Sequence, residues 1–512
     1  MMGVRAAHIG LLALLLLAGA LRIGYLDDSR FMAERQFRSA LIARADYLAT
    51  TVDVTDPRRI AAETSARRLG VLEPPIMESL AVTAYRVLDG EALWIPRALA
   101  TLAWLAGGAL LFMLARRYVT EIGALIACAY FLFLPLGVLV SISFLPDSLM
   151  LALFLASLLG IVRHEEMPTT RRLLVAGALA GACVLVKPLC LFGLAGAFAA
   201  LRLDRAGLAG LFDRTSMAFG TLLLLPALAY YAYGMFVAGF LEGQAAASFL
   251  PELLLRFRFW LDTFRTLVEA LGAAPLVLAV LGMAIPASRR FRALLAGLIA
   301  GHFLLCLVFT YHVQMAAHYH LALVIPVAMC LGAAMAGLIQ LVRSQENTFA
   351  RLSSLAAAPI LTLVLAYLAI SSSVTGSRPL VDEDVARTVG QVVGHSTRVV
   401  YVSQYYGMPL EYFGALSGWF WPNPVDDVER ALNGTDARAR SVEERLSSLG
   451  SVLSRAEPDF RPEYFVITDF QRYANHPDLD SFLRENCRIL AEEPRFLVFG
   501  DCQLAAAAST GI

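Results

Sequence analysis

Long apolar runs separated by short polar turns recur through the first 372 residues of the chain. A helix needs about 20 predominantly apolar residues to cross the roughly 30 Å hydrocarbon core of a bilayer. The first run, 8–26, has no small-x-small cleavage sequence and is followed by ten more, so we expect a retained helix rather than a removed leader. The two short runs flanking Lys187-Pro188 are predicted either as two spans or as one bent unit. The ten further expected spans are 95–115, 121–141, 147–162, 172–186, 189–203, 215–236, 272–288, 293–311, 320–342 and 353–372.

Two more polar segments, 27–94 and 237–271, interrupt this rhythm. Apolar residues recur in them at helical spacing, which predicts amphipathic helices over 31–48, 78–88 and 249–267. Such helices commonly lie in the interface plane of a membrane. A plain bundle of spans would not need them.

The last part of the chain, 373–512, has a different pattern of short β-rich runs separated by helical stretches. This alternation predicts a small α/β domain. Cys487 and Cys502 flank two neighbouring expected strands, so they are predicted either to pair or to remain free thiols. The expected strands are 398–402, 464–468 and 495–499, and the expected helices are 425–432, 441–454 and 479–485.

Composition agrees with a membrane protein. The chain is 58% hydrophobic and 16% charged, whereas soluble domains have about 45–50% apolar and about 25% charged residues. This excludes an ordinary soluble enzyme, a disordered chain, a disulfide scaffold and a nucleic-acid-binding protein. The net charge of zero conceals a division, because 373–512 holds 20 acidic residues and 13 arginines and the remainder is correspondingly basic.

Basic residues in short loops predict the orientation. If the N-terminus is cytoplasmic, the arginines at 116–117, 163–172, 202–214, 289–292 and 343–351 all lie in cytoplasmic turns. The short opposite turns, 142–146 and 311–319, carry no arginine or lysine. We therefore expect a polytopic α-helical membrane protein of about 11 transmembrane helices, with 1–372 as the membrane domain and 373–512 as an extracytoplasmic α/β domain. The arginine-rich composition favours a bacterial inner (cytoplasmic) membrane.

Ionisable residues near the bilayer are costly and are therefore functional candidates. Four groups of them fall on the predicted outer side: acids and arginines of the first loop, Asp147, Lys187 and a histidine group. Each also has a structural interpretation, as a helix cap for Asp147, a snorkelling chain for Lys187, water-bound interfacial histidines, or arginines bound to anionic lipid. Because all four fall on one side, they favour a pocket for an anionic amphiphile. The members are Asp27, Asp28, Glu34, Arg30, Arg35, Arg38, Arg44, Asp147, Lys187, His312, His318 and His320.

Three stretches resemble the GT-C superfamily of membrane glycosyltransferases, in particular its protein-mannosyltransferase-like and aminoarabinose-transferase-like branch. The stretch 37–44 is similar to the family's first-loop helix. The Pro-Pro segment at 73–78, with 94–97, is similar to the segment entering the second span. The stretches 143–147 and 184–188 are similar to the family's second-loop acid and later lysine turn.

The resemblance implies a polyprenyl-phosphate-linked sugar as donor and an acceptor on the extracytoplasmic face. It also implies a first-loop aspartate that acts as base or orients the acceptor, with cations at the leaving phosphate. The chain departs from this pattern, because Arg35 and Gln36 stand where an Asp-Glu pair is expected. Three alternatives stay open: Glu34 serves as the acid, Asp28 serves from the preceding turn, or the acid is absent.

We predict Glu34 as base, with Asp28 as its alternative, and Asp147 as a second acid that orients the acceptor or a metal. Arg35, Arg38 and Lys187 are expected near the donor phosphate. His318 and His320 are further candidates for phosphate or acceptor contacts.

The sequence requires no cofactor and has no metal-ligand cysteine cluster, but it allows a divalent cation. The expected partners are the polyprenyl-phosphate sugar, a glycan, lipid or protein acceptor, and membrane lipids, with no nucleic acid. Two competing hypotheses remain: a non-catalytic GT-C relative that binds or assembles envelope glycans, and a transporter of lipid-linked intermediates. The chain has no internal repeat, which argues against transport.

Overall fold

The computed structural model contains two compact units built from interleaved parts of the chain. One comprises 1–27, 72–77 and 96–376, and the other comprises 28–71, 78–95 and 377–512. The structure describes residues 4–27, 31–70, 73–238, 250–285, 288–343, 381–422, 442–449 and 460–503. The expected eleventh span, 353–372, and the predicted domain boundary beside it lie outside these residues.

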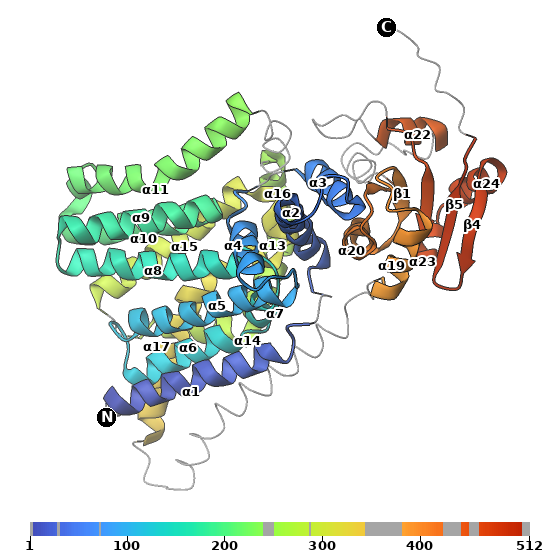
Figure 1. Ribbon diagram of the computed structural model, residues 1–512. Helices are drawn as coiled ribbons and strands as arrows, with labels where there is room; N and C mark the ends of the chain where they lie inside the picture. Colours follow the sequence, from blue (N-terminus) through green and yellow to red (C-terminus); the bar gives the residue numbers. More distant parts are fainter. Residues whose placement is uncertain are drawn as a thin grey trace. The chain divides into compact units, whose positions relative to one another are not determined.

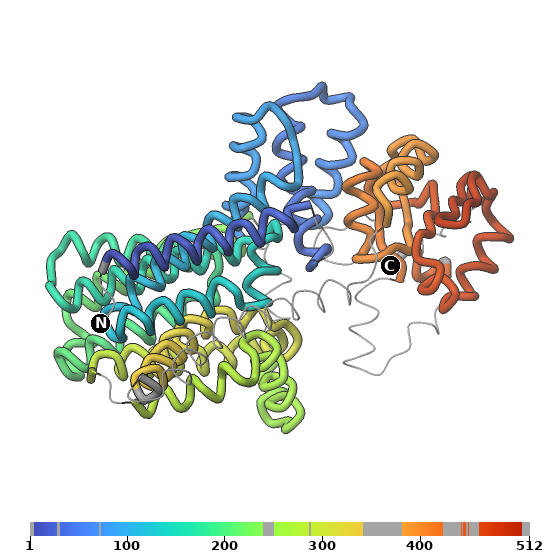
Figure 2. The backbone as a smooth tube through the Cα atoms, turned by 90° about the horizontal axis from the view of Figure 1, so that it is seen from below, coloured from blue at the N-terminus to red at the C-terminus, as the bar shows by residue number. Residues whose placement is uncertain are grey.

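The first unit is a bundle of long apolar helices that run side by side (Figures 1 and 2). Among the described residues, six helices are long and apolar enough to cross a membrane, or up to eight if each of two bent helix pairs is one span. On either side of Lys187 lie two separate helices, α9 and α10, rather than one bent unit. The long helices are α1 (Val4–Ile23), α5 (Trp94–Ala115), α8 (Asp147–Glu166), α9 (Thr170–Val186), α10 (Cys190–Gly210), α11 (Arg214–Ala232, continued by the π-helical turn η1, Tyr233–Val237), α15 (Arg289–Val308) and α17 (Val324–Arg343).

Close helix packing in this bundle depends on small residues. The helices α10 and α15 approach so closely that a Cβ atom on Gly196 would lie 2.2 Å from the carbonyl oxygen of Gly297. Small residues permit such backbone approach, which is how helices gain packing energy where lipid is as apolar as the side chains. Substituting alanine at Gly196 is therefore expected to push the two helices apart.

The predicted span 121–141 is divided into α6 (Glu121–Phe133) and α7 (Pro135–Ser141), which meet at an angle of 59°. Proline cannot donate the helical hydrogen bond and so breaks the helix at this point. Two side chains from other helices donate hydrogen bonds to backbone carbonyls beside this break. The Trp104 indole donates to the Phe131 carbonyl at 3.2 Å, and Arg22 donates to the Leu132 carbonyl at 2.8 Å. These bonds satisfy carbonyls at a helix end that would otherwise be unpaired.

A second bent pair joins α13 (Phe257–Leu271) to α14 (Ala273–Met283) at 92°. Gly272 has φ +82°, a left-handed conformation that favours glycine, so it allows this bend. The expected amphipathic helix 249–267 corresponds to a short 3₁₀ turn, η2 (Pro251–Leu255), followed by α13. Between α15 and α17 the chain forms α16 (Thr310–Met315) and the 3₁₀ segment η3 (Ala317–Leu323).

The second unit combines the first-loop helices with the C-terminal domain. The two predicted helices are present as α2 (Ala33–Thr51) and α4 (Ile76–Val87). A third helix, α3 (Pro57–Leu69), was not predicted. Two sequence features are typical of a helix start here, since Asp56 caps the N-terminus and Pro57 occupies the first turn. The many charged and polar residues of α3, however, give it no clear apolar periodicity.

The C-terminal domain contains a five-stranded sheet in the order β2-β1-β3-β5-β4. The strand β1 pairs in parallel with β2 and β3, whereas β5 pairs antiparallel with β3 and β4. Three strands were predicted, and β2 and β4 were missed. Of the expected helices, two are present as α22 and α24, and 425–432 lies outside the described residues. The strands are β1 (Val399–Val402), β2 (Gly418–Phe420), β3 (Tyr464–Ile467), β4 (Arg488–Glu493) and β5 (Phe496–Gly500), and the helices are α19 (Glu383–Val392), η4 (Gln404–Gly407), α20 (Met408–Gly414), α22 (Val442–Ser448), α23 (Phe470–Tyr473) and α24 (Pro477–Asn486).

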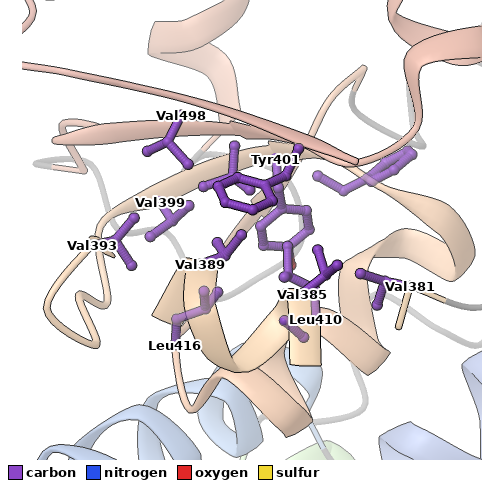
Figure 3. Close-up of a cluster of buried hydrophobic side chains, with 13 residues drawn as sticks. Val381, Val385, Val389, Val393, Val399, Tyr401, Leu410, Leu416 and Val498 are labelled. Atoms are coloured by element: carbon purple, nitrogen blue, oxygen red, sulfur yellow. The ribbon is translucent and has the colours of Figure 1, made fainter. Parts of the chain in front are cut away.

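Successive side chains of a strand point to opposite faces of a sheet, and β1, β3 and β5 bury side chains on both faces, whereas the edge strand β4 is largely exposed. Val399 and Tyr401 enter the cluster shown in Figure 3, whereas Val400 and Val402 enter a second cluster. The predicted alternative in which Cys487 and Cys502 pair is confirmed by a disulfide between them. It links the residue before β4 to the segment that follows β5.

Candidate functional site

Asp147 and Lys187, two of the predicted site residues, form a buried ion pair. The Nζ atom of Lys187 donates to Oδ1 of Asp147 at 2.8 Å, and the two side chains are 1% and 2% exposed. An ion pair this deeply enclosed is costly to assemble, because both charges lose their hydration. A buried ion pair usually contributes little net stability. Stability alone therefore does not explain this pair, which favours a functional role for Asp147 and Lys187.

Two helix ends bring this pair together. Asp147 opens α8, one residue after Pro146, and its negative charge lies in the first turn of that helix, where the helix dipole favours it. Lys187 terminates α9 with an extended conformation and is followed by Pro188. Because a residue before proline avoids the helical region, the Lys-Pro sequence ends α9 where its ammonium group reaches Asp147. The predicted snorkelling of Lys187 is not what the structure shows.

The predicted histidines separate into two environments. His320 is fully buried in η3, with Nδ1 2.9 Å from Nε2 of His302. His318 is half-buried and lies against the ring of Tyr319. The structure therefore places His320, but not His318, in a buried polar cluster. Its partner His302 lies in the predicted span 293–311 but was not predicted as a site residue.

The first-loop candidates Glu34, Arg35 and Arg38 belong to the second compact unit. Glu34 lies in the first turn of α2 and is half-buried. Burial raises the pKa of its carboxyl group, while neighbouring Arg35 acts in the opposite direction. Arg38 donates to the carbonyl of Gly70 at 2.6 Å. The alternative acid, Asp28, lies outside the described residues.

Gln36, which occupies a position of the expected Asp-Glu pair, is buried and donates from Nε2 to the carbonyl of Phe31. This bond lies within the turn that starts α2. Ser39, one turn further along, donates to Glu78 at 2.6 Å, which links α2 to α4. The start of α2, where the resemblance implies an acidic pair, is thus fixed by hydrogen bonds to Phe31 and Glu78.

Arg44, further along α2, has a set of partners that the sequence analysis did not identify. It bonds to Glu91 at 2.8 Å, and its guanidinium group lies 3.5 Å from the centre of the Tyr412 ring. The Tyr412 hydroxyl donates to Glu91 at 2.5 Å, and burial raises the pKa of this phenol. Phe37 adds an aromatic contact to Tyr412. Tyr412 is thus buried against α2 and bonded to Glu91.

A second buried charge network lies at the other end of α8. Glu165 is bound by Arg202 of α10 at 3.4 Å and receives a 2.8 Å hydrogen bond on its carbonyl from Arg205. Arg202 also pairs with Asp213, which caps α11. These arginines belong to the basic turns that the sequence analysis used for orientation. They form ion pairs with the acidic residues Glu165 and Asp213 at the same end of the helix bundle.

Four buried or partly buried polar residues were not predicted from the sequence: Arg22, Glu91, His302, and Cys306, whose ligand atom lies within 4.8 Å of those of His302 and His320. Arg22 and Cys306 lie in apolar runs, where a single polar residue gives no periodic signal. Glu91 lies in a short loop without a motif. A polar residue inside a span was the available signal for Arg22 and His302, since such residues are rare in lipid.

The fold matches that of known membrane transferases. The family model for dolichyl-phosphate-mannose-protein mannosyltransferase matches residues 73–230, which include Asp147 and Lys187. No curated protein matches the chain in sequence.

Three solved structures illustrate the similarity. ArnT from Cupriavidus metallidurans bound to undecaprenyl phosphate has a TM-score of 0.57 at 15% identity, covering 97% of this chain and 99% of that chain. The oligosaccharyltransferase AglB from Archaeoglobus fulgidus, in complex with an inhibitory peptide and a dolichol-phosphate, has a TM-score of 0.54 at 13% identity, covering 98% and 75%. The Archaeoglobus fulgidus oligosaccharyltransferase in complex with Zn and sulfate has a TM-score of 0.51 at 11% identity, covering 89% and 68%.

These similarities establish the fold. The chain is a multi-pass membrane protein with the GT-C fold and a small C-terminal sheet domain. The predicted resemblance to the GT-C superfamily and the predicted fold class are confirmed.

Proposed function

We propose that this protein is a glycosyltransferase of a bacterial inner membrane. It transfers a sugar from a polyprenyl-phosphate donor to an acceptor on the extracytoplasmic face. The single observation that carries the proposal is the enclosed Asp147–Lys187 pair, which two helix ends build inside a GT-C fold. The family model with a lipid-phosphate mannose in its description, and the solved ArnT with bound undecaprenyl phosphate, support this class of donor.

In the proposed reaction an acceptor oxygen attacks the anomeric carbon of the donor sugar. The bond between that carbon and the phosphate oxygen breaks, and its electron pair remains on the phosphate. Lys187 stabilises the charge that develops on this leaving group, as a fixed cation in a dry site does effectively. Asp147 holds the ammonium group in position before the donor arrives and orients the acceptor or a divalent cation.

The acceptor proton must move to a base, and Glu34 is the proposed base. Its carboxylate takes the proton as attack proceeds. Because burial raises the pKa of Glu34, the ionised base is lost at a higher pH than for an ordinary glutamate. Transfer should therefore fall as the pH is lowered, along a limb that lies above the usual glutamate range. Arg35 and Arg38 on the same helix, and the half-buried His318, complete the proposed phosphate and acceptor contacts.

A transfer assay tests the proposal. The full chain is reconstituted in liposomes with undecaprenyl-phosphate hexose or aminopentose carrying a labelled sugar, and with membrane extract as acceptor. We expect label to leave the lipid fraction and undecaprenyl phosphate to accumulate. In Glu34→Gln, we expect slow transfer and no acid limb in the pH profile. An unchanged acid limb in that variant would assign the base elsewhere, with Asp28 tested next.

A non-catalytic relative is the second candidate, and the Arg35-Gln36 sequence favours it because it replaces the expected acidic pair. This candidate predicts that undecaprenyl phosphate binds, as measured by native mass spectrometry, while every donor stays intact. Absence of both binding and transfer would contradict both candidates.

A further inference from the structure

Three buried side chains with metal-binding atoms meet beside η3. His302 and Cys306 lie one turn apart on α15, and His320 reaches them from η3. One ligand atom from each residue lies within 4.8 Å of the others. The side chains are 7%, 6% and 0% exposed. Residues distant in sequence thus bring two imidazoles and one thiol into one enclosed place.

The hydrogen bonds assign the protons of the two rings. Nε2 of His320 lies 3.0 Å from the carbonyl oxygen of Val313, which only accepts, so Nε2 carries the proton. A neutral His320 then has a lone pair on Nδ1, and the 2.9 Å contact makes His302 Nε2 its donor. Nδ1 of His302 is therefore also a lone pair. It is buried, and among the described residues it has no hydrogen-bond partner.

The surroundings of His320 are those of a metal ligand. Histidines that bind metals almost always donate their second ring N–H to a carbonyl or carboxylate, which holds the ring in place. Here Val313 accepts that hydrogen bond, and Thr266 of α13 lies 3.0 Å from the same nitrogen and donates to the same carbonyl at 2.7 Å. On the other side, Cys306 lies in an apolar cluster with Phe259 and Val313. The polar atoms are thus enclosed by an apolar shell.

A purely structural interpretation explains only part of this arrangement. Hydrogen bonds from His320 to Val313 and His302 would fasten η3 to α15. They leave one lone pair of His302 unsatisfied in the protein interior, which is costly. They also give no reason for a thiol one turn away from it on α15. A bound cation accounts for all three residues: the hydrogen bond from His302 Nε2 to His320 Nδ1 breaks on binding, and the lone pair of His320 Nδ1 then becomes available as a ligand.

We propose that His302, Cys306 and His320 bind a zinc-type divalent cation. Zinc takes imidazole nitrogen at about 2.0–2.1 Å and thiolate sulfur at about 2.3 Å, distances that ligand atoms within 4.8 Å of one another can meet with small side-chain movements. Binding releases the thiol proton of Cys306, and the resulting thiolate leaves one net positive charge on the site. Three protein ligands leave a fourth tetrahedral position for a water or an oxygen ligand.

The test measures metal in the full-length protein, purified in detergent. After removal of metal with a chelator, the protein is titrated with zinc, and bound zinc is measured by elemental mass spectrometry. We expect close to one zinc per chain in the wild type and affinity lower by at least about tenfold in Cys306→Ser and His320→Gln. Cys330→Ser is the matched control, because Cys330 is a buried cysteine of α17 outside the cluster. It should bind zinc like the wild type.

Cobalt substitution provides a readout that needs no variant to fold. We expect the wild type loaded with Co²⁺ to show the visible bands of tetrahedral cobalt and a thiolate-to-cobalt charge-transfer band. Wild-type protein that takes up neither metal would overturn the proposal. So would a cobalt spectrum without the thiolate band, or zinc binding by Cys306→Ser that equals the wild type. None of these outcomes depends on glycosyl transfer.

Discussion

The two ends of α8 carry buried acids with different partners. At the start of the helix, Asp147 has a lysine of the α9 end as its ion-pair partner, and both side chains are almost fully enclosed. At the other end, Glu165 is shared by Arg202 and Arg205, and the network continues to Asp213, which is 38% exposed. One helix thus supports an enclosed pair and an extended network that reaches the surface.

The difference indicates different roles. An extended network distributes charge among several arginines, and a group at its edge keeps part of its hydration, so the network fastens α8, α10 and α11 at modest cost. An enclosed pair has no such relief, because both ions lose water. A folding role alone could be served by apolar residues at Asp147 and Lys187. The proposed interaction of Lys187 with the donor phosphate explains why these two positions carry charged residues instead.

The largest expected effect concerns Asp147. We expect Asp147→Asn to lower the rate of transfer by at least about 100-fold, the scale of a lost carboxylate in proton transfer or orientation. Glu165→Gln at the other end is the matched control, and its transfer per folded molecule should stay close to that of the wild type. Both rates are measured in liposomes and normalised to the monodisperse fraction from size exclusion. Equal losses in the two variants would remove the distinction between the two ends.

The next prediction separates folding from chemistry within the pair. Lys187→Met removes the ammonium group that is bonded to the buried carboxylate of Asp147 and should lower the free energy of unfolding by about 3–5 kcal/mol. The double variant Asp147→Asn/Lys187→Met removes both charges and should recover most of that loss. Thermal unfolding in detergent measures the stabilities, and the transfer assay measures the activity. We expect the double variant to remain inactive; recovery of transfer together with stability would show that the pair is structural.

At the Glu165 end, stability alone should change. Arg202 is 7% exposed and has two acidic partners, so among the described residues Arg202→Met leaves Arg205 as the one cationic partner of Glu165. We expect a loss of a few kcal/mol, at or below the range of about 3–5 kcal/mol for a broken buried pair. Transfer per folded molecule should be unchanged. A variant with wild-type thermal stability but impaired transfer would place function at this end as well.

The smallest effect is expected at the exposed edge. Arg117 pairs with Glu166, the last residue of α8, and the two side chains are 28% and 33% exposed. Solvent screens such a pair, so Arg117→Gln should cost less than about 1 kcal/mol. The midpoint of thermal unfolding, compared at low and high salt, checks this. A larger loss would mean that the network is more enclosed than its exposure indicates.

Much of the fold could be predicted from the sequence because apolar runs have a period and a length. The long helices, α2, α4 and three strands of the sheet were all anticipated. The missed elements have weak patterns: α3 carries four arginines and little apolar periodicity, and β2 has only three residues. The break at Pro135 was overlooked because Phe131 and Leu132 on its N-terminal side, and the residues beyond it, are as apolar as the rest of the span.

The candidate site could be predicted only in part. Asp147 and Lys187 were selected as ionisable residues near a membrane, and the structure joined them into one pair. The roles of Glu34, Arg35 and Arg38 remain predictions. His320 was selected, but its partners His302 and Cys306 were not, because no spacing along the chain relates η3 to the middle of α15.

By itself the sequence determined that this protein lies in a membrane, where most of its long helices lie, and which polar residues are costly in such surroundings. These properties follow from local composition and period. Only the tertiary structure decided which of those residues meet. Asp147 and Lys187, or His302 and His320, are neighbours because helix ends and a 3₁₀ segment converge in space. Such convergence depends on packing between elements, which leaves no mark in the spacing of residues along one of them.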